Sequence, residues 1–426
     1  MLIDLKVKNY LSIRDTANLS MEKTLVRKMA ETNIIKGTNL LTSAYIFGPN
    51  GSGKTNLFFA IKAVKDLIIH PSKTIDEEIN YRPFIFDDRS KEEPTEIDIE
   101  FITNQNSYEY HISFTNVIKS ETLKRNDNFL YKRENNTVKI IDSKYNKFDW
   151  TQLRNNLTTI SFLQNFNDDY SKEVFNWFNN ELIFVDDINN SQSLANRIEA
   201  IINDDEKKYR FLQFLNSLGF KYKNFYVKKF VQTVDEDLRS ILPNNIIENM
   251  IKPKKQVFLT LDEFSYLKKD GVPQKLSMQE DLPFGMESVG SQQLINLASI
   301  LFSQSASDGN KTFLIDEYGA FLHSELAKSL IKIFNLGFLS TNQFIINTHN
   351  LETMDASIRA DQIYFMDKNY TGVSNLYSLD DFNDLTKKSD FKFVRRYING
   401  KFGANPQINI DEMLNSFKSN DKGVSY

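Results

Sequence analysis

A glycine-rich stretch reads Gly48-Pro49-Asn50-Gly51-Ser52-Gly53-Lys54-Thr55 and fits the pattern G-x-x-x-x-G-K-T. An apolar run from Ser43 to Phe47 precedes it, and apolar residues at helical spacing continue from Lys54 to Ile68. A strand, this loop and a helix, in that order, are the structural context that the pattern requires. The stretch therefore predicts a phosphate-binding loop (P-loop) within an α/β fold.

Each part of the loop has its own expected role. The glycines let successive backbone N–H groups turn toward phosphate oxygens, and the helix N-terminus adds its dipole. Lys54 is expected to reach the β- and γ-phosphates as a catalytic residue, and the Thr55 hydroxyl to ligate Mg²⁺. We therefore expect ATP and Mg²⁺ as cofactors, with the nucleotide bound by Gly48, Pro49, Asn50, Gly51, Ser52, Gly53, Lys54, Thr55 and Asn56. A glycine-rich turn without a ligand is the alternative.

An acidic pair follows a second apolar run, in Phe313-Leu314-Ile315-Asp316-Glu317. A strand that ends in two acids presents them at its carboxyl end, where ligands bind in open α/β sheets. Asp316 is expected to hold Mg²⁺ through water, and Glu317 to polarise the attacking water as a catalytic residue. A helix N-cap would give the same dipeptide.

A third motif, Glu287-Ser288-Val289-Gly290-Ser291-Gln292-Gln293, opens an amphipathic helix. A serine hydroxyl, free backbone N–H groups and a helix dipole together make an anion site, so Ser288 and Gly290 are candidate nucleotide-binding residues. The motif resembles the ABC signature, although Val289 replaces the usual first glycine. In that family this helix N-terminus faces the γ-phosphate bound by the other subunit. An ordinary serine N-cap is the alternative.

Two histidines lie near these motifs. The run Phe344-Ile345-Ile346-Asn347-Thr348 is a buried strand that delivers His349 at its carboxyl end. Its position resembles that of the ABC switch histidine, which implies a catalytic contact with the γ-phosphate and the attacking water. His323, in the segment 321–324, falls where a D-loop should lie and either touches a partner subunit or serves packing.

Composition limits the class of protein. The 426 residues carry a net charge of -4, so contact with nucleic acid or an anionic membrane would need a local patch. The absence of cysteine excludes disulfides, thiolate catalysis and Cys-based metal sites, although an AT-rich genome would deplete cysteine too. The chain starts with an alternating strand pattern and has no long apolar stretch. We expect a soluble, cytoplasmic protein.

The hydrophobic patterns divide the chain into segments. Alternating runs at 96–101, 108–114 and 138–141 predict antiparallel strands, and a helical period follows from Trp150 to Leu218. Runs at 225–231 and 256–264 predict further strands, the second leading into a turn at 268–271. We therefore expect an α/β ATPase head, a mixed sheet covered by helices, with a mixed α+β insertion between P-loop and signature motifs. The expected domains are 1–144, the N-terminal lobe with an antiparallel β subdomain; 145–280, the insertion; 281–406, the C-terminal lobe; and 407–426, a tail.

The order of these four motifs resembles the RecF/SMC-like branch of ABC ATPases. Further stretches resemble the stand-alone AAA-type ATPases of bacterial abortive-infection and antiphage systems, the AbiL and RloA group, with the PARIS ATPase as a relative. These stretches are Asn9–Arg14, Leu41–Asn56, Arg359–Tyr364, Asn375–Leu379 and Arg396–Pro406. Ser291-Gln292-Gln293 and Asn405 depart from the usual residues, and no Q-loop is identified.

The resemblance implies an ATP hydrolase that works as a homodimer, or a higher oligomer, with composite ATP sites. It also implies a sensor or switch in antiphage defence that controls a separately encoded effector, a nuclease or toxin. The alternative is a RecF-like DNA-binding ATPase in repair or maintenance. Cations interleave with aromatic residues from Lys221 to Phe230, as in surfaces that track nucleic acid, but an edge strand with lysines on its wet face gives the same pattern.

Overall fold

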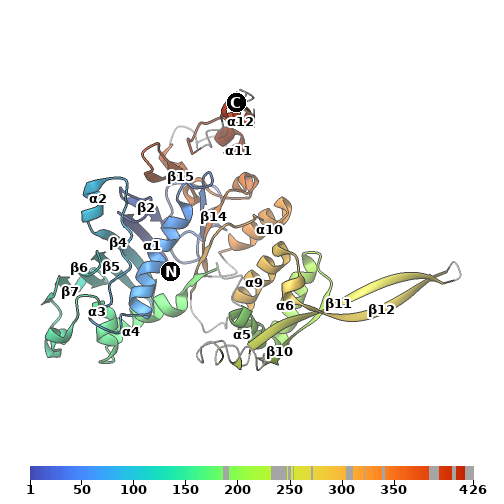
Figure 1. Cartoon of the computed structure of the whole chain (residues 1–426), viewed down its shortest axis with the longest axis horizontal. Coiled ribbons are helices and arrows are strands. Elements are labelled where there is room, and N and C mark those ends of the chain that lie inside the picture. Colours follow the sequence, from blue (N-terminus) through green and yellow to red (C-terminus); the bar gives the residue numbers. More distant parts are fainter. Residues whose placement is uncertain are drawn as a thin grey trace, which may run out of the picture.

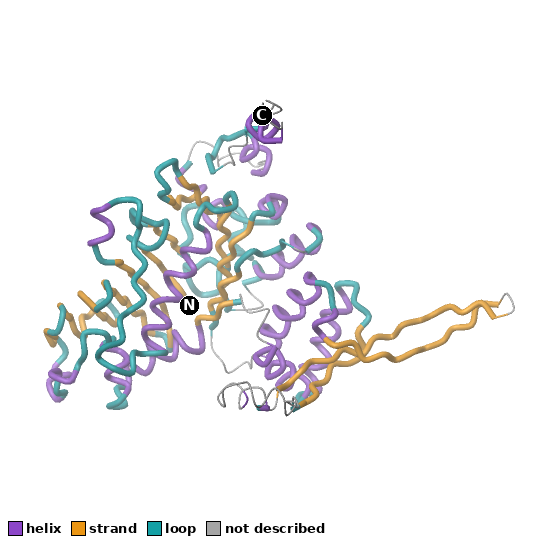
Figure 2. Tube along the Cα trace, viewed as in Figure 1, coloured by secondary structure: helices purple, strands orange, loops and turns teal. Residues whose placement is uncertain are grey.

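The computed structural model describes residues 1–185, 191–231, 247, 251–252, 254–269, 272–303, 310–320, 322–337, 341–382, 393–404 and 409–417. Within these residues the strands form three sheets, and helices cover them (Figure 1). Figure 2 shows the distribution of helix and strand along the same view.

The central sheet has six strands and contains the P-loop strand β3. Four neighbouring pairs are parallel, and only the edge strand β16 is antiparallel to its neighbour. In order across the sheet the strands are β16 (Ser374–Ser378), β15 (Ile363–Lys368), β3 (Ser43–Phe47), β14 (Gln343–Thr348), β13 (Thr312–Ile315) and β9 (Leu182–Phe184). The strands predicted at 43–47 and 312–315 are confirmed at both ends.

The second sheet has seven strands and is antiparallel throughout. Its strands, in order, are β2 (Ala17–Ser20), β1 (Leu2–Lys8), β4 (Thr95–Thr103), β5 (Asn106–Phe114), β6 (Ile118–Arg125), β7 (Asn128–Glu134) and β8 (Thr137–Ile140). The predicted antiparallel character of this region is confirmed, while β6 and β7 were not predicted.

The bounds of the helices are α1 (Lys54–Ile69), α2 (Asp88–Glu92), α3 (Thr159–Gln164), α4 (Asp169–Asn176), α5 (Ser191–Ile202), α6 (Asp205–Ser217), α9 (Val289–Ser303), α10 (Ser324–Phe334), α11 (Phe393–Ile398) and α12 (Ile410–Phe417). In the described part of the chain, the longest helices are α1 with 16 residues, α9 with 15 and α6 with 13. Single turns of 3-10 or π helix are η1 (Ser143–Lys147), η2 (Trp150–Gln152), η3 (Trp177–Glu181), η4 (Phe284–Met286), η5 (Leu351–Asp355), η6 (Ala360–Gln362) and η7 (Leu379–Asp381).

Two hydrophobic clusters lie on opposite faces of the six-stranded sheet. Alternate residues of β3 belong to different clusters: Ala44 and Ile46 to one, Tyr45 and Phe47 to the other. The first cluster also contains the apolar face of α1 and one face of the seven-stranded sheet, so α1 is packed between the two sheets (Figure 1). The second contains residues of α5, α6, α9 and α10. Both faces of the central sheet are therefore buried, as its continuous apolar strands predict.

Different parts of the predicted insertion pack against different parts of the fold. Residues from 145 to 184 pack on the seven-stranded sheet, where the Trp177 ring stacks on Phe101 at 4.0 Å, and β9 joins the central sheet. The helices α5 and α6 lie against α9 (Figure 1). The limits expected for the four domains stay predictions.

The third sheet contains the strands predicted at 225–231 and 256–264, and the second of them continues to Lys269, into the turn predicted at 268–271. The sheet consists of β10 (Tyr222–Phe230), β11 (Lys254–Lys269) and β12 (Val272–Pro283), all antiparallel. The part of β11 and β12 far from β10 projects from the rest of the chain (Figures 1 and 2). The turn residues Asp270 and Gly271 lie outside the described part, as do Phe321, Asn405 and Pro406.

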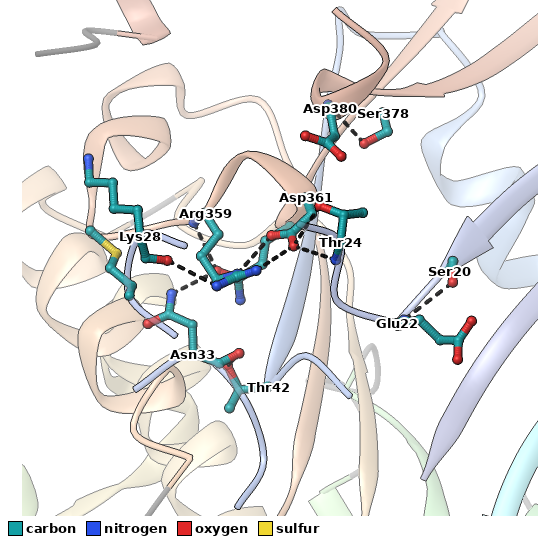
Figure 3. Close-up of polar contacts among 12 residues, drawn as sticks. Ser20, Glu22, Thr24, Lys28, Asn33, Thr42, Arg359, Asp361, Ser378 and Asp380 are labelled. Atoms are coloured by element: carbon teal, nitrogen blue, oxygen red, sulfur yellow. Dashed lines mark hydrogen bonds and ion pairs between the residues drawn. The ribbon is translucent and has the colours of Figure 1, made fainter. Parts of the chain in front are cut away.

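The segment that leads into β3 is held on the sheet by a buried ion pair (Figure 3). Arg359 Nη2 lies 2.6 Å from Oδ2 of Asp361, and both side chains are almost fully buried. The same carboxylate oxygen accepts hydrogen bonds from the backbone N–H and the hydroxyl of Thr24, and Arg359 Nη1 donates to the carbonyl of Lys28. The pair therefore connects the segment around Thr24 and Lys28 to the turn that precedes β15.

Candidate functional site

The P-loop joins β3 to α1 and needs two of its glycines for steric reasons. A Cβ atom on Gly48 would lie 2.2 Å from the Met366 carbonyl oxygen of β15. Gly53, with φ +104, would place a Cβ atom 2.3 Å from Oγ of Ser374. Both positions are closed to any side chain, because the loop is pressed against the central sheet and its edge.

Two serines far apart in sequence support the loop from behind. Ser374 Oγ lies 2.6 Å from the Ser52 carbonyl oxygen and 2.7 Å from Ser12 Oγ. Ser12 Oγ in turn accepts a hydrogen bond of 2.6 Å from Asn56 Nδ2. The sequence did not reveal this support, since isolated serines carry no spacing signal.

Lys54 starts α1 and points back into the loop. Its ammonium group donates to the carbonyl oxygens of Gly48 at 2.7 Å and Pro49 at 2.9 Å. Burial lowers the pKa of Lys54, whereas the charges of Asp316 and Glu317 raise it. The ammonium group is therefore partly desolvated, and a charge-assisted hydrogen bond from it to a phosphate oxygen would be stronger than one between neutral groups. The two nearby carboxylates repel an anion, so a cation such as Mg²⁺ would favour its binding.

Asp316 follows β13 and collects hydrogen bonds from neighbouring elements. Its Oδ1 accepts from the Thr55 hydroxyl at 3.3 Å, from Asn347 Nδ2 at 3.1 Å and from the Glu317 N–H at 3.1 Å. Thr55 belongs to α1 and Asn347 to β14, which is parallel to β13. Three elements thus fix this carboxylate, and the role of Asn347 was not predicted.

The two other predicted catalytic residues are exposed at the same edge of the sheet. Glu317 has φ +49, a conformation that is strained for a side chain of this size and that is common at functional sites. His349 follows β14 and is exposed, while Thr348 before it donates a hydrogen bond of 2.7 Å to the Tyr318 carbonyl oxygen. The chain on both sides of the carboxylate is therefore held in place, while its side chain faces solvent.

These residues line one cavity of about 300 Å³. Its lining consists of Asn50, Gly51, Ser52, Gly53, Lys54, Thr55, Asn56, Asp316, Glu317, Thr348 and His349. Most of the residues predicted from three of the four motifs, the P-loop, the acidic pair and the strand before His349, are thus brought together. Gly48 and Pro49 contribute carbonyl oxygens to Lys54, whereas Ser288 and Gly290 are not in the lining.

The signature motif begins α9 at a different place. Ser288 is exposed and acts as the N-cap, since its Oγ accepts from the Ser291 N–H at 3.2 Å and lies 2.8 Å from Ser291 Oγ. His323 is likewise an N-cap, because its Nδ1 accepts from the Glu325 N–H at 3.3 Å at the start of α10. The capping that the sequence left as an alternative for Ser288 is therefore real, whereas the cap formed by His323 was not predicted. Capping excludes no second role at either position.

The donor set of the cavity fits a nucleotide with Mg²⁺. The buried Ser52 Oγ, which belongs to the cavity lining, lacks a hydrogen-bond partner among the described residues, so a polar atom remains for a ligand. One carboxylate and one hydroxyl, Asp316 and Thr55, match the few protein ligands that Mg²⁺ takes alongside phosphate oxygens and water. No group of three His, Cys, Asp or Glu side chains in the described segments could hold a metal alone.

Solved structures of SMC and RecF proteins are similar to this chain at low identity. The SMC head domain from Thermotoga maritima shares 15% identity over 88% of this chain and 98% of its own, with a TM-score of 0.40. An Smc head domain from Pyrococcus furiosus, bound to the C-terminal domain of ScpA, shares 11% over 90% and 98%, with a TM-score of 0.40. The recombination mediator RecF shares 11% over 88% and 98%, with a TM-score of 0.38.

In the described part of the chain, no helix has the length and apolarity needed to cross a membrane. No curated protein matches the chain. A family described as "AAA domain, putative AbiEii toxin, Type IV TA system" matches residues 44–355, which is well over half of the 426 residues and includes all four motifs. The chain belongs to this AAA family.

Proposed function

We propose that the protein is an ABC-type ATPase that uses ATP binding and hydrolysis as a switch. The observation that carries this proposal is the single cavity lined by Lys54, Thr55, Asp316, Glu317 and His349. Lys54 and the P-loop amides would hold the phosphates, and Thr55 and Asp316 would hold Mg²⁺, which neutralises charge on the phosphates when bound. Glu317 and His349 would orient the attacking water.

The ABC assignment requires that two copies pair head to tail. Ser288 and Gly290 lie outside the cavity of their own chain, at the exposed start of a helix of 15 residues. Free N–H groups and the helix dipole at that position favour an anion. In the proposed homodimer they would close over the γ-phosphate bound by the partner, and hydrolysis would reopen the pair. Higher oligomers are compatible with this arrangement.

The proposed biological role is the control of a separate effector in antiphage defence. The family description names a toxin of a type IV toxin–antitoxin system, which supports a role in bacterial conflict. The motifs assigned to chemistry in this chain all serve the ATPase, so we infer that a co-encoded nuclease or toxin carries out the damage. The ATPase would act as the sensor that releases or restrains it.

A RecF-like role in DNA maintenance is the second candidate. It is favoured by the exposed surface of β10, where Lys228 Nζ lies 5.1 Å from the centre of the Tyr226 ring and 4.8 Å from that of Phe258. Cations beside stacked aromatic rings suit nucleic-acid backbones and bases. The same lysine lies 4.0 Å from Asp281, which weakens its attraction for phosphate.

The test combines biochemistry with phage challenge. The purified chain should hydrolyse ATP in the presence of Mg²⁺, and Lys54→Ala should abolish nucleotide binding. In bacteria, the wild type expressed with its genomic neighbour should restrict phage, while either gene alone, or Lys54→Ala with the neighbour, should not. Full protection by the ATPase without a co-encoded protein, or protection that survives Lys54→Ala, would overturn the switch and favour DNA maintenance.

A further inference from the structure

The projecting part of the third sheet is a two-stranded ribbon. In the described residues, 262–269 of β11 and 272–279 of β12 pair only with each other, because β10 ends its pairing at Leu261. We refer to these two segments as the β11–β12 ribbon. At about 3.3 Å per residue, eight residues extend about 25 Å beyond the three-stranded part. Figure 2 shows the two strands projecting together from the rest of the chain.

Tyr222 lies at this root. It is the partner of Leu261, the last pair between β10 and β11 before the ribbon leaves the sheet. Its side chain is 3% exposed, and its ring lies 5.1 Å from that of Phe220 and 5.3 Å from that of Phe225. The N–H and carbonyl of Tyr222 both bond to the Asn216 side chain on α6. Ring and backbone are thus fixed, and so is the direction of the phenol hydroxyl.

That hydroxyl contacts the turn that carries the signature serine. Tyr222 Oη donates a hydrogen bond of 2.9 Å to Oε1 of Glu287, the residue before Ser288. The Glu287 carbonyl accepts 2.8 Å from Gln292 Nε2, so the turn is also tied to α9. Burial and the Glu287 carboxylate raise the pKa of Tyr222, which therefore stays a neutral donor at physiological pH.

The chain also leads directly from the ribbon to the same turn. β12 ends at Pro283, and only η4 and Glu287 separate it from Ser288. Phe284, the first residue of η4, is buried in the second hydrophobic cluster and so anchors the connection between β12 and Ser288 to the core. The ribbon therefore reaches Ser288 by two routes, the covalent one through η4 and the hydrogen bond from Tyr222.

We propose that Tyr222 is a positioning residue that couples the β11–β12 ribbon to Ser288, so that the ribbon is an input to the composite ATP site and a change in the ribbon alters that site. This inference rests on the proposed function for the role of Ser288. A directional hydrogen bond to a carboxylate is stronger than one between neutral groups. A shift at the ribbon root would therefore move Glu287 and Ser288 with it.

The first experiment reads the position of Ser288 without any need for catalysis. The chain has no cysteine, so Ser288→Cys creates a single thiol whose alkylation rate reports on the turn. Tyr222→Phe removes only the hydroxyl and should raise this rate at least about threefold, as the loss of a coupled contact does. Tyr226→Phe makes the same change on the same strand, without a bond to Glu287, and should leave the rate unchanged. Equal rates in all three chains would overturn the positioning role.

The second experiment tests the coupling to the ribbon. Replacing residues 263–278 by Asn-Gly joins the paired Asp262 and Gln279 through a two-residue hairpin turn. This shortening should alter the alkylation rate of Ser288→Cys in the chain with Tyr222 and have less than half that effect with Tyr222→Phe, since the effects are not additive along one path. An identical effect in both backgrounds, or none in either, would overturn the input role of the ribbon.

Turnover separates this inference from the proposed function. With the native Ser288, Tyr222→Phe should lower kcat for ATP while the KM and the nucleotide affinity stay unchanged, because the P-loop is untouched. Glu287→Gln keeps an acceptor and should lower kcat less than Glu287→Ala. A wild type that hydrolyses no ATP would refute the proposed function, whereas normal kcat in Tyr222→Phe beside an active wild type would refute only the inference.

Discussion

The Thr55 hydroxyl donates a hydrogen bond to Oδ1 of Asp316 at a distance of 3.3 Å. The contact joins the start of α1 to the end of β13 and places the two expected Mg²⁺ ligands side by side. Because a carboxylate binds Mg²⁺ far better than an amide does, Asp316→Asn should remove the gain in ATP affinity that Mg²⁺ gives, and should lower turnover by about 100-fold. Calorimetric titration of ATP with and without Mg²⁺ measures the first effect.

The matched control for this change is Asp367→Asn. Asp367 lies near the end of β15 in the same sheet and does not line the cavity. Its replacement should leave the Mg²⁺ dependence intact. If Asp316→Asn behaved in the same way, Asp316 would not be a metal ligand.

The sequence predicted the central sheet better than the antiparallel one. The strands β3 and β13 are apolar on both faces, and such runs are easily recognised. Strands β6 and β7 were missed because Glu121 and Arg133, which look like solvent-facing residues, form a buried pair 3.5 Å apart. Strand β9 has only three residues and owes its conformation to pairing with β13, which no local pattern shows.

In the site, too, residues that belong to sequence motifs could be predicted, whereas residues that only the tertiary fold brings there could not. The P-loop and the Asp316–Glu317 pair follow fixed spacings beside recognisable strands, so their meeting in one cavity could be predicted. Ser12, Ser374 and Asn347 support the loop and the carboxylate from distant parts of the chain. Their residue types are common and their spacing is set by the fold alone, which is why the sequence could not identify them.

Glu317→Gln should abolish turnover and leave ATP binding intact. The substitution removes the carboxylate that orients water but does not alter the phosphate cradle, and a positioned general base contributes about 100-fold or more. The variant should accumulate as an ATP-bound dimer, measured by size-exclusion chromatography with multi-angle light scattering. Glu352→Gln, at an exposed position just beyond His349, is the control and should hydrolyse ATP normally. A rate for Glu317→Gln near that of the wild type would exclude it as the catalytic residue.

Gly53→Ala should disrupt the P-loop by crowding. The added methyl group would collide with Ser374 Oγ and, at 2.7 Å, with Ser12 Oγ, in a backbone conformation that also strains an L residue. ATP affinity should fall by about 10-fold or more, because a displaced loop no longer directs its N–H groups at phosphate. Gly37→Ala tests strain alone, since Gly37 has φ +82 and nothing within 4 Å of its Cβ position. Equal ATP affinity in both variants would show that the contact with Ser374 is unimportant.

Glu100→Gln should stabilise the protein at neutral pH. Burial raises the pKa of Glu100, and the charges of Glu109 and Asp4 raise it further, so the folded state holds its proton more tightly than the unfolded state, whose pKa is near 4.5. A carboxyl group whose pKa is raised by folding destabilises the protein when it is ionised. This destabilisation is absent below about pH 4 and develops as the pH rises through the pKa of the folded state. The variant should therefore have a higher Tm than the wild type at pH 7 and the same Tm near pH 4.

The control for the pH experiment is Glu134→Gln, an exposed glutamate at the end of β7 in the same sheet. It loses the same charge and should change Tm little at either pH. A Glu100→Gln chain that is less stable at pH 7 than at about pH 4, relative to wild type, would reverse the sign and refute the electrostatic account.

Ser288 should act on the nucleotide of the partner subunit. Lys54→Ala removes ATP binding in its own chain, and Ser288→Arg blocks the anion site that the same chain would offer to its partner. In a heterodimer of the two variants, one composite site carries both defects and the other carries neither. Each variant alone should be inactive. Each heterodimer should have up to about half of the activity of a wild-type dimer, because one of its two composite sites is intact. Two different affinity tags purified in sequence isolate the heterodimer, and colorimetric phosphate release measures its turnover.

If Ser288 acted on its own chain instead, both sites of the heterodimer would be defective, because one lacks Lys54 and the other lacks Ser288. An inactive, verified heterodimer would therefore contradict the head-to-tail arrangement, while activity in the Ser288→Arg homodimer would show that the serine is only a helix cap.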